Sequence, residues 1–254
     1  MKIRLHQFLS KSGRFKSKSE VKNAIWEGYI SINGRIIKDI AYEFNPRKRV
    51  VSFRGETLEL PNEESYFLLN KPPGVICSRL NKQEASLGKK SVFEIFKDRV
   101  EDKTYQRLVT VGRLDEFTTG FLLVTTDGGI VHRITNPESG IGKTYRVEVK
   151  SEINEGQAKS IRDGVRISVS DGEQSENYTS KKARLTIEGK SSVTLTIEEG
   201  RKREVRRIFE AVGNGVLSLH RISIGGMELS DYGLGEGEFC EISAEEVSSG
   251  VFGE

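Results

Sequence analysis

Cysteine and histidine are scarce in this sequence, which has two Cys and three His among its 254 residues. Cys77 and Cys240 form no closely spaced pair, and His6, His132 and His220 lie far apart along the chain. A disulfide framework requires more cysteines, and a structural zinc site requires clustered Cys or His ligands. The sequence therefore favours neither of them, and we expect a protein that binds no metal.

Long apolar runs are also missing. No stretch approaches the roughly 20 apolar residues that cross a membrane. The basic start, MKIRLHQFLSKSGRFKSKSE, is not followed by the small-residue cleavage site of a secretory signal. We therefore expect a cytoplasmic protein without a membrane partner. Hydrophobic residues still make up 35% of the chain, including 12 Phe and 7 Tyr, which is enough for a folded core.

The net charge of +3 is distributed unevenly along the chain. Residues 1–60 carry 13 Lys/Arg and 6 Asp/Glu, a net charge of +7, whereas the remaining residues carry 27 and 31, a net charge of −4. Such an asymmetry favours binding of a polyanion by the N-terminal part. A basic face that is merely solvated is the alternative.

Residues 1–60 predict a small module of two helices and a small sheet. Residues 4–12 have the apolar spacing of a short helix. Ser17 and Glu20 have the spacing of a capping box, which predicts a second helix over residues 19–27. The Asn33-Gly34 pair then favours a tight turn between two short strands. With so few residues, the core of this module must be small.

The rest of the chain predicts a larger domain of a different composition. Residues 61–65, PNEES, read as a linker, because they are polar and begin with proline. Residues 66–245 contain many short strands and few helices, without regular βαβ alternation. This pattern indicates an α+β domain with a mixed, mainly antiparallel sheet and flanking helices. Residues 246–254, rich in Ser and Gly, predict a flexible tail.

One acidic residue occupies an unusual position in the larger domain. Asp115 lies in the segment Gly112–Gly120, between the strand-like runs 108–111 and 121–124. A carboxylate on a short loop between two buried strands is held rigidly and can face a cleft. The alternative is an ordinary surface ion pair. The chain contains few other candidate catalytic residues, so Asp115 is the first candidate for a catalytic residue.

Two further segments bring basic and aromatic side chains into regular elements. Lys143 and Tyr145 are two positions apart in a strand and therefore point to the same face. The helix that follows residue 203 has apolar residues at the spacing i, i+3, i+4, i+7, namely Val205, Ile208, Phe209 and Val212. Three arginines lie beside this apolar stripe: Arg203, Arg206 and Arg207.

The N-terminal module also carries short motifs: Arg4-Leu5-x-x-Phe8-Leu9-Ser10-x-x-Gly13, Ser17-Lys18, Ala24-Ile25, Glu27-Gly28 and Ile32-Asn33-Gly34. Together they resemble the ribosomal-protein S-four-like (alpha-L) RNA-binding domain. In that family the two helices and the turn into the hairpin grip structured RNA. We therefore expect RNA contacts from the basic side chains Arg4, Lys18, Lys22 and Arg35.

Longer motifs follow in the larger domain: NKPPGVICS (70–78), GRLDEFTTGFLLVTTDGG (112–129), GKTYRVEV (142–149), EGRKREVRRIFEAVGN (199–214) and LHRISIGGMEL (219–229). They resemble the bacterial rRNA pseudouridine synthases of the small-subunit type, whose relatives that act on large-subunit stem-loops share the same architecture. The resemblance covers nearly the whole chain. It implies isomerisation of a uridine in RNA to pseudouridine, with no cofactor and no metal.

The resemblance also implies roles for individual residues. Asp115 would be the essential carboxylate, either as a nucleophile or as a group that stabilises an oxocarbenium-like species and moves protons. Tyr145 would stack on the flipped uridine, and Arg206 would pair with Asp115. Arg113 would help to open the stem or hold a phosphate. Further RNA contacts are expected from Lys71, Lys143, Arg203 and Arg207, with a structural role as the alternative for Lys71 and Lys143.

The substrate implied by the resemblance is ribosomal RNA, most directly small-subunit (16S) rRNA, either naked or in a ribosomal subunit precursor. Large-subunit (23S) rRNA is an alternative within the same family. A non-catalytic RNA-binding factor of ribosome assembly is the alternative from a different class. An enzyme acting on sugars or free nucleotides is disfavoured, because the chain has no Gly-rich phosphate loop. We expect a monomer.

Overall fold

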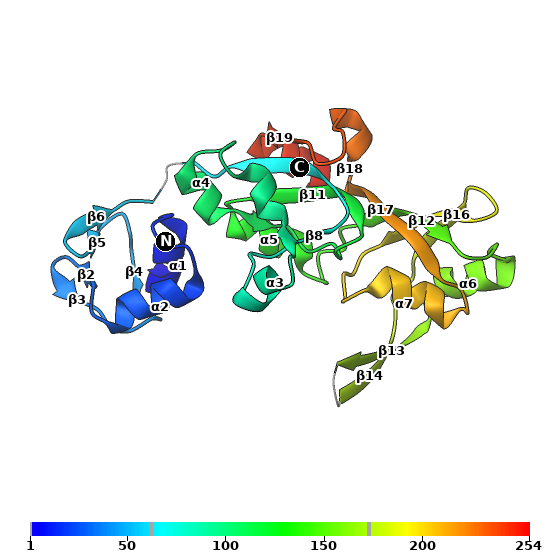
Figure 1. Cartoon of the computed structure of the whole chain (residues 1–254), viewed down its shortest axis with the longest axis horizontal. Coiled ribbons are helices and arrows are strands. Elements are labelled where there is room, and N and C mark those ends of the chain that lie inside the picture. Colours follow the sequence, from blue (N-terminus) through cyan, green and yellow to red (C-terminus); the bar gives the residue numbers. More distant parts are fainter. Residues whose placement is uncertain (1, 61–62, 172–173) are drawn as a thin grey trace. The chain divides into compact units, whose positions relative to one another are not determined.

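The structure, a computed structural model, describes residues 2–60, 63–171 and 174–254 (Figure 1). The contacts divide the chain into two compact units. The first comprises Met1–Ser65 and Phe96–Val109, and the second comprises Tyr66–Ile95 and Thr110–Glu254. Residues 61 and 62 of the expected linker lie outside the described residues. Within the described parts, no helix has both the length and the apolar character needed to span a membrane.

The first unit contains the two expected helices and a small sheet. Its elements are β1 (Ile3–Arg4), α1 (Leu5–Lys11), α2 (Lys18–Trp26), β2 (Ile30–Ile32), β3 (Arg35–Ile36), β4 (Glu43–Phe44), β5 (Val51–Phe53) and β6 (Glu56–Leu58). The Ser17 hydroxyl accepts a hydrogen bond from Glu20 N at 3.1 Å, so the expected cap of α2 is confirmed. The core of this unit is made of side chains from both helices and the sheet, including Leu5, Leu9, Ile25 and Ile30.

The first unit also includes a segment that the sequence analysis assigned to the larger domain. Within residues 96–109, α4 (Asp102–Arg107) ends at Arg107, which is buried and paired with Glu64. Lys11 pairs with the same carboxylate at 3.3 Å. Gly13, at φ +70°, lies so close to this segment that a Cβ there would be 2.9 Å from Lys103 O. The expected range of 66–245 for the larger domain therefore contains an excursion into the first unit.

The second unit is built on a nine-stranded sheet, as expected for an α+β fold. The main strand order is β15-β16-β12-β17-β11-β7-β19, with β10 (Val109–Thr110) beside β11 and β18 (Met227–Glu228) beside β17. Strands β11 and β17 are parallel, and the other neighbours in the main order are antiparallel. In that order the strands are β15 (Arg184–Ile187), β16 (Ser192–Ile197), β12 (Lys143–Val149), β17 (Val216–Ile224), β11 (Thr119–Thr125), β7 (Tyr66–Lys71) and β19 (Phe239–Ile242). The predicted mixed, mainly antiparallel sheet is confirmed.

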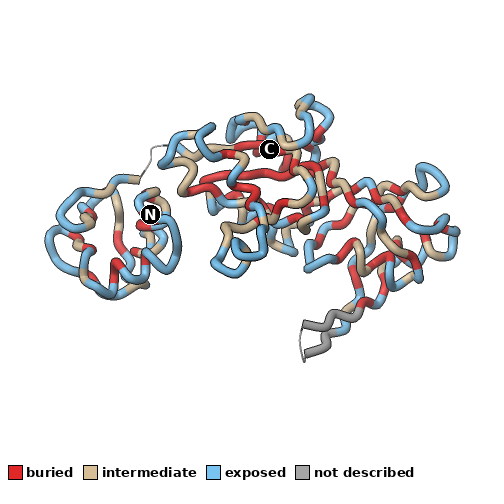
Figure 2. The backbone as a smooth tube through the Cα atoms, in the orientation of Figure 1, coloured by how far each residue is buried: buried red, intermediate tan, exposed pale blue. Residues whose placement is uncertain are grey.

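Short helices flank this sheet. They are α3 (Lys82–Ser86), α5 (Gly128–Thr135), α6 (Glu155–Asp163), α7 (Glu204–Ala211) and α8 (Ala244–Val247). Residues 92–96 form a 3-10 helix, and the remaining strand pairs are β8 (Val75–Ile76) with β9 (Lys90–Ser91) and β13 (Arg166–Asp171) with β14 (Gln174–Thr179). The buried stretches of the chain follow the central strands (Figure 2).

The C-terminal segment differs from the expected flexible tail. Helix α8 continues into a π-helical turn, Ser248–Phe252, and the side chains of Val247 and Val251 are 1% and 6% exposed. Both belong to the core cluster that includes Met227. A Cβ at Gly225 would lie 2.4 Å from Val251 O, which shows how closely the segment packs on the sheet. The spacing i, i+4 of these two valines was the sequence signal for this packing.

Candidate active site

Asp115 lies on the loop between β10 and β11, as the sequence analysis expected. The loop is closed by a hydrogen bond from Thr118 N to Asp115 O at 3.0 Å. Strand β11 is held on both sides, by β7 and by β17. At Gly120, with φ +96°, a Cβ would be only 2.3 Å from Arg221 O of β17, so no other residue fits this close approach. The backbone that carries Asp115 is therefore fixed by the central strands.

A buried lysine supports the loop that carries Asp115. Lys71, at the end of β7, is 0% exposed, and its ammonium donates to Pro72 O, Glu116 O and Thr118 O at 2.8–3.0 Å. Burial lowers the pKa of Lys71, and the nearby Cys77, Asp115 and Glu116 partly oppose this shift. All three N–H donors are occupied by backbone carbonyls. Of the two roles expected for Lys71, the structure therefore favours the structural one, because this side chain holds the loop.

Arg206 reaches Asp115 from helix α7. Its Nε lies 3.9 Å from Asp115 Oδ2, and its Nη1 donates to Val216 O of β17 at 3.1 Å. The side chain of Arg206 is 16% exposed, and that of Asp115 is 36% exposed. The apolar stripe of α7 is buried, including Val205 and Ile208, which fixes the face on which Arg206 emerges. The structure thus brings together the two side chains that the sequence analysis paired.

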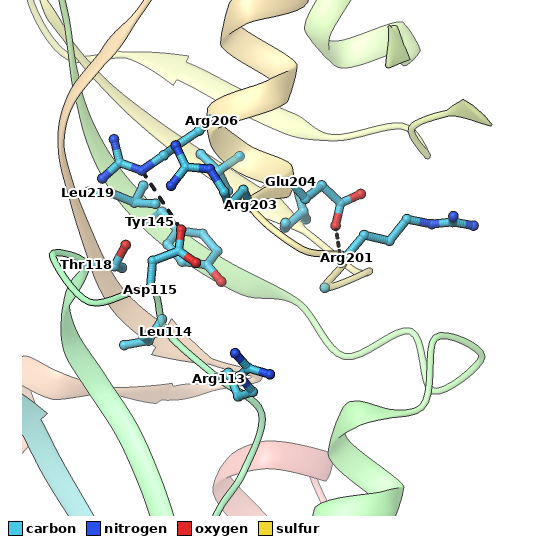
Figure 3. Close-up of a pocket in the computed structure, with 13 residues that line it drawn as sticks. Arg113, Leu114, Asp115, Thr118, Tyr145, Arg201, Arg203, Glu204, Arg206 and Leu219 are labelled. Atoms are coloured by element: carbon cyan, nitrogen blue, oxygen red, sulfur yellow. Dashed lines mark hydrogen bonds and ion pairs between the residues drawn. The ribbon is translucent and has the colours of Figure 1, made fainter. Parts of the chain in front are cut away.

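Tyr145 lies beside this pair. It belongs to β12, is 7% exposed, and its ring lies next to the Asp115 carboxylate (Figure 3). Lys143, two positions earlier, is also buried, but its ammonium donates to Ile141 O at 3.0 Å and Glu198 O at 3.4 Å. Burial, with the neighbouring Arg221 as the next cause, lowers the pKa of Lys143. Its burial and these two bonds favour the structural role for Lys143 as well.

Asp115, Tyr145 and Arg206 line one pocket of the second unit. Its other lining residues are Arg113, Leu114, Thr118, Ile197, Gly200, Arg201, Arg203, Glu204, Val205 and Leu219. Arg113 and Arg203 are exposed. Arg207 is turned back onto Lys202 O at 2.8 Å. The pocket therefore combines two carboxyl groups, one aromatic ring and several guanidinium groups.

Several lining residues were not expected from the sequence, and Glu204 is the buried, charged one among them. Glu204, the first residue of α7, is 3% exposed, although it stands in a run of charged residues. Its carboxylate accepts a hydrogen bond from Arg201 N at 2.8 Å (dashed in Figure 3). The three-residue spacing to Arg201 is that of a helix-start contact, and this was the only signal in the sequence.

The four basic residues expected to contact RNA from the first unit are all exposed. Lys18 and Lys22 lie on α2 and Arg35 on β3. Arg4 precedes α1, and its Nε pairs with Glu43 at 3.3 Å, with more than half of each side chain accessible. An exposed pair of this kind is weak, so it does not prevent Arg4 from contacting a phosphate.

Comparisons with known proteins agree with this arrangement. The family model described as RNA pseudouridylate synthase matches residues 65–211, and the S4 domain model matches residues 3–50. A solved structure described as a pseudouridylate synthase has a TM-score of 0.65 at 32% identity and covers 97% of this chain and 98% of its own.

Curated relatives align over nearly the whole chain. The ribosomal small subunit pseudouridine synthase A of Haemophilus influenzae is 32% identical over 96% of this chain and 98% of its own. The protein of the same name from Escherichia coli K12 is 35% identical over 87% of this chain and 89% of its own. An uncharacterized RNA pseudouridine synthase of Bacillus subtilis, YtzG, is 32% identical over 96% and 97%.

Proposed function

The chain belongs to the RNA pseudouridine synthase family, and from this premise we propose that it isomerises one specific uridine of small-subunit (16S) rRNA, with Asp115 as the catalytic carboxylate. The observation that supports this role is the arrangement of Asp115, Arg206 and Tyr145 around one pocket. An RNA-binding protein without enzymatic activity has no use for a carboxylate directed at a polyanion.

The reaction exchanges one bond of the base for another. The bond from ribose C1′ to the base nitrogen N1 breaks, the base turns, and a bond forms from C1′ to C5. The base loses the C5 proton and gains a proton at N1, so no co-reactant is consumed. A carboxylate at C1′ serves this exchange in one of two ways. It attacks C1′ as a nucleophile, or it stabilises the oxocarbenium-like species and moves the protons.

The neighbours of Asp115 fit the needs of this reaction. A paired uridine must leave its stack before a side chain can reach C1′, and an aromatic ring can then stack on the base. Tyr145 presents its ring beside the carboxylate. Arg206 compensates the carboxylate charge when RNA phosphates approach. Arg113, exposed at the edge of the pocket, is placed to contact the RNA backbone.

The first unit supplies the docking surface in this proposal. Its S4 domain match and its exposed Arg4, Lys18, Lys22 and Arg35 favour contacts to phosphates. Phosphate contacts release counterions, so binding should weaken steeply with salt concentration. The partner is then ribosomal RNA, free or in a precursor of the ribosomal subunit.

The assignment to 16S rRNA is supported by the relatives named as small-subunit enzymes, at 32–36% identity. It is tested by mapping pseudouridines across both large rRNAs in cells that lack this gene. Deletants that carry either the wild type or Asp115→Asn are mapped in parallel. Loss of one 16S position that only the wild type restores would support the proposal. Loss of a 23S position would move the substrate to the large subunit, and an unchanged map would refute the proposed activity.

A further inference from the structure

Two buried carboxyl groups stand at the two ends of a loop that lines the pocket of Asp115. Glu199 follows β16 and is 7% exposed, and Glu204 begins α7 and is 3% exposed. Glu204 Oε2 accepts from Arg201 N at 2.8 Å, and Glu199 Oε1 accepts from Lys181 N at 2.6 Å. The carboxyl groups therefore pin both ends of the short loop from Glu199 to Glu204. Gly200, Arg201 and Arg203 of this loop line the pocket that contains Asp115.

The pair needs a proton. Glu204 Oε1 is buried, and among the described groups no donor reaches it if both carboxyls are ionised. Burial raises the pKa of Glu204 to about 8, and its hydrogen bond to the Glu199 carboxyl acts in the same direction. Two adjacent buried anions would repel each other, whereas one shared proton gives a hydrogen bond. Near neutral pH, Glu204 is therefore the neutral member of the pair.

The other charged and titratable groups around Glu204 do not reverse this. On the same loop, Arg201 lowers the pKa of Glu204, but burial and Glu199 prevail. Lys143 faces it from β12, with its ammonium held by backbone carbonyls. From β14 comes Tyr178, whose pKa burial raises to about 12, with Glu204 as the next cause. Its hydroxyl is buried, and Arg201 lies over its ring at 4.0 Å.

The loop that the pair holds is conformationally demanding. Arg203 has a left-handed backbone with φ +54°, an uncommon conformation for a residue with a side chain. It is the last residue before α7, and Arg206 emerges one turn later to face Asp115. A displacement of this loop would therefore move Arg203 and Arg206 relative to the carboxylate of Asp115.

We propose that Glu204 is a positioning residue, whose protonated carboxyl bonds to Glu199 and holds the Gly200–Arg203 wall and the start of α7 in the arrangement that brings Arg206 to Asp115. Ionisation of Glu204 places two anions side by side and distorts that arrangement. A test of this inference by enzymatic rate rests on the proposed function, whereas a direct titration of the Glu204 carboxyl does not. Its consequence is a loss of activity on the alkaline side of neutrality.

The size of that loss follows from the titration. A group with a pKa of about 8 is roughly nine-tenths protonated at pH 7 and roughly one-tenth at pH 9. We expect the single-turnover rate of pseudouridine formation on 16S rRNA transcribed in vitro to fall about tenfold between these values. Glu204→Gln can accept from Arg201 N and donate to Glu199 without a titrating proton. It should match the wild type at pH 7 within about twofold and lose the alkaline fall.

Three further variants separate this account from a general effect of mutation. Glu199→Gln offers an amide N–H to Glu204, so its alkaline fall should also disappear. Glu204→Ala leaves Arg201 N without its acceptor, so it should be slower than the wild type at every pH. Glu210→Gln alters an exposed carboxylate of the same helix and should keep the wild-type profile. A Glu204→Gln profile that falls like the wild type would overturn the proposal.

A physical measurement tests the pair without any activity. The protein is labelled with ¹³C at the glutamate carboxyls. The Glu204 resonance, identified by its absence from the spectrum of Glu204→Gln, should titrate in the wild type with a midpoint near pH 8. A midpoint below about pH 6 would refute the shared proton. If the wild type modified no RNA at any pH, the proposed function would fail, while the carboxyl titration would still decide on the pair.

Discussion

The contribution of Arg206 can be worked out from its distance to Asp115. Two unit charges 3.9 Å apart, the separation of Arg206 Nε and Asp115 Oδ2, attract by about 4 kcal/mol at an effective dielectric constant of ~20 and by about 1 kcal/mol in water. Because the Asp115 side chain is 36% exposed, the value lies between these limits. We take ~2 kcal/mol, which corresponds to roughly 30-fold in rate.

Arg206→Ala should therefore slow pseudouridine formation by about 10- to 100-fold. Arg206→Lys should fall between this variant and the wild type, because it keeps the charge but loses the planar group that also donates to Val216 O. The assay is tritium release from 16S rRNA that contains [5-³H]uridine, since the reaction removes the C5 proton. Single-turnover conditions separate the chemical step from product release.

A matched control is available in the same unit. Arg162 of α6 pairs with Glu155 at 3.3 Å and donates to Leu185 O, away from the pocket lining. Arg162→Ala should release tritium at the wild-type rate. If a folded Arg206→Ala variant were within about twofold of the wild type, the assumed interaction with Asp115 would carry no catalytic weight and the reasoning would be refuted.

Two other predictions concern the loop support and the docking surface. Lys71→Met removes a buried donor from three carbonyls, of which Glu116 O keeps its hydrogen bond from Gly74 N, so the free energy of unfolding measured in urea should drop by about 2–4 kcal/mol. An unchanged value would contradict the supporting role. Reversing the charges of Lys18, Lys22 and Arg35 together should weaken binding to 16S rRNA and flatten its dependence on salt concentration. An unchanged slope in a filter-binding titration would place the phosphate contacts elsewhere.

Much of the architecture was readable from local patterns. The Ser17 cap, the apolar stripe of α7 and the loop with Asp115 depend on residues close together in sequence, and the structure has each of them. The partnership of Asp115 and Arg206 came from the family resemblance, because nothing local links residues so far apart. Its geometry became visible only with β17 and α7 in place.

The errors share a physical cause, which is that burial is a tertiary property. The sequence left a structural role and a phosphate contact open for Lys71 and Lys143, and only the structure shows the backbone carbonyls that hold their ammonium groups. Glu204 stands in a run of charged residues that gives no sign of burial, and it is buried next to Glu199. Val251 looked like part of a polar tail. Its packing depends on Gly225 and Gly226, which form the turn between β17 and β18.

The central claim is that the Asp115 carboxylate performs the reaction, and its most direct test compares purified wild type with Asp115→Asn. Both proteins are mixed with tritiated 16S rRNA from the deletion strain, and RNA binding and tritium release are measured on the same samples. The account predicts equal binding, release of one tritium equivalent by the wild type, and no release above background by Asp115→Asn. Release by Asp115→Asn at a rate near that of the wild type would contradict it.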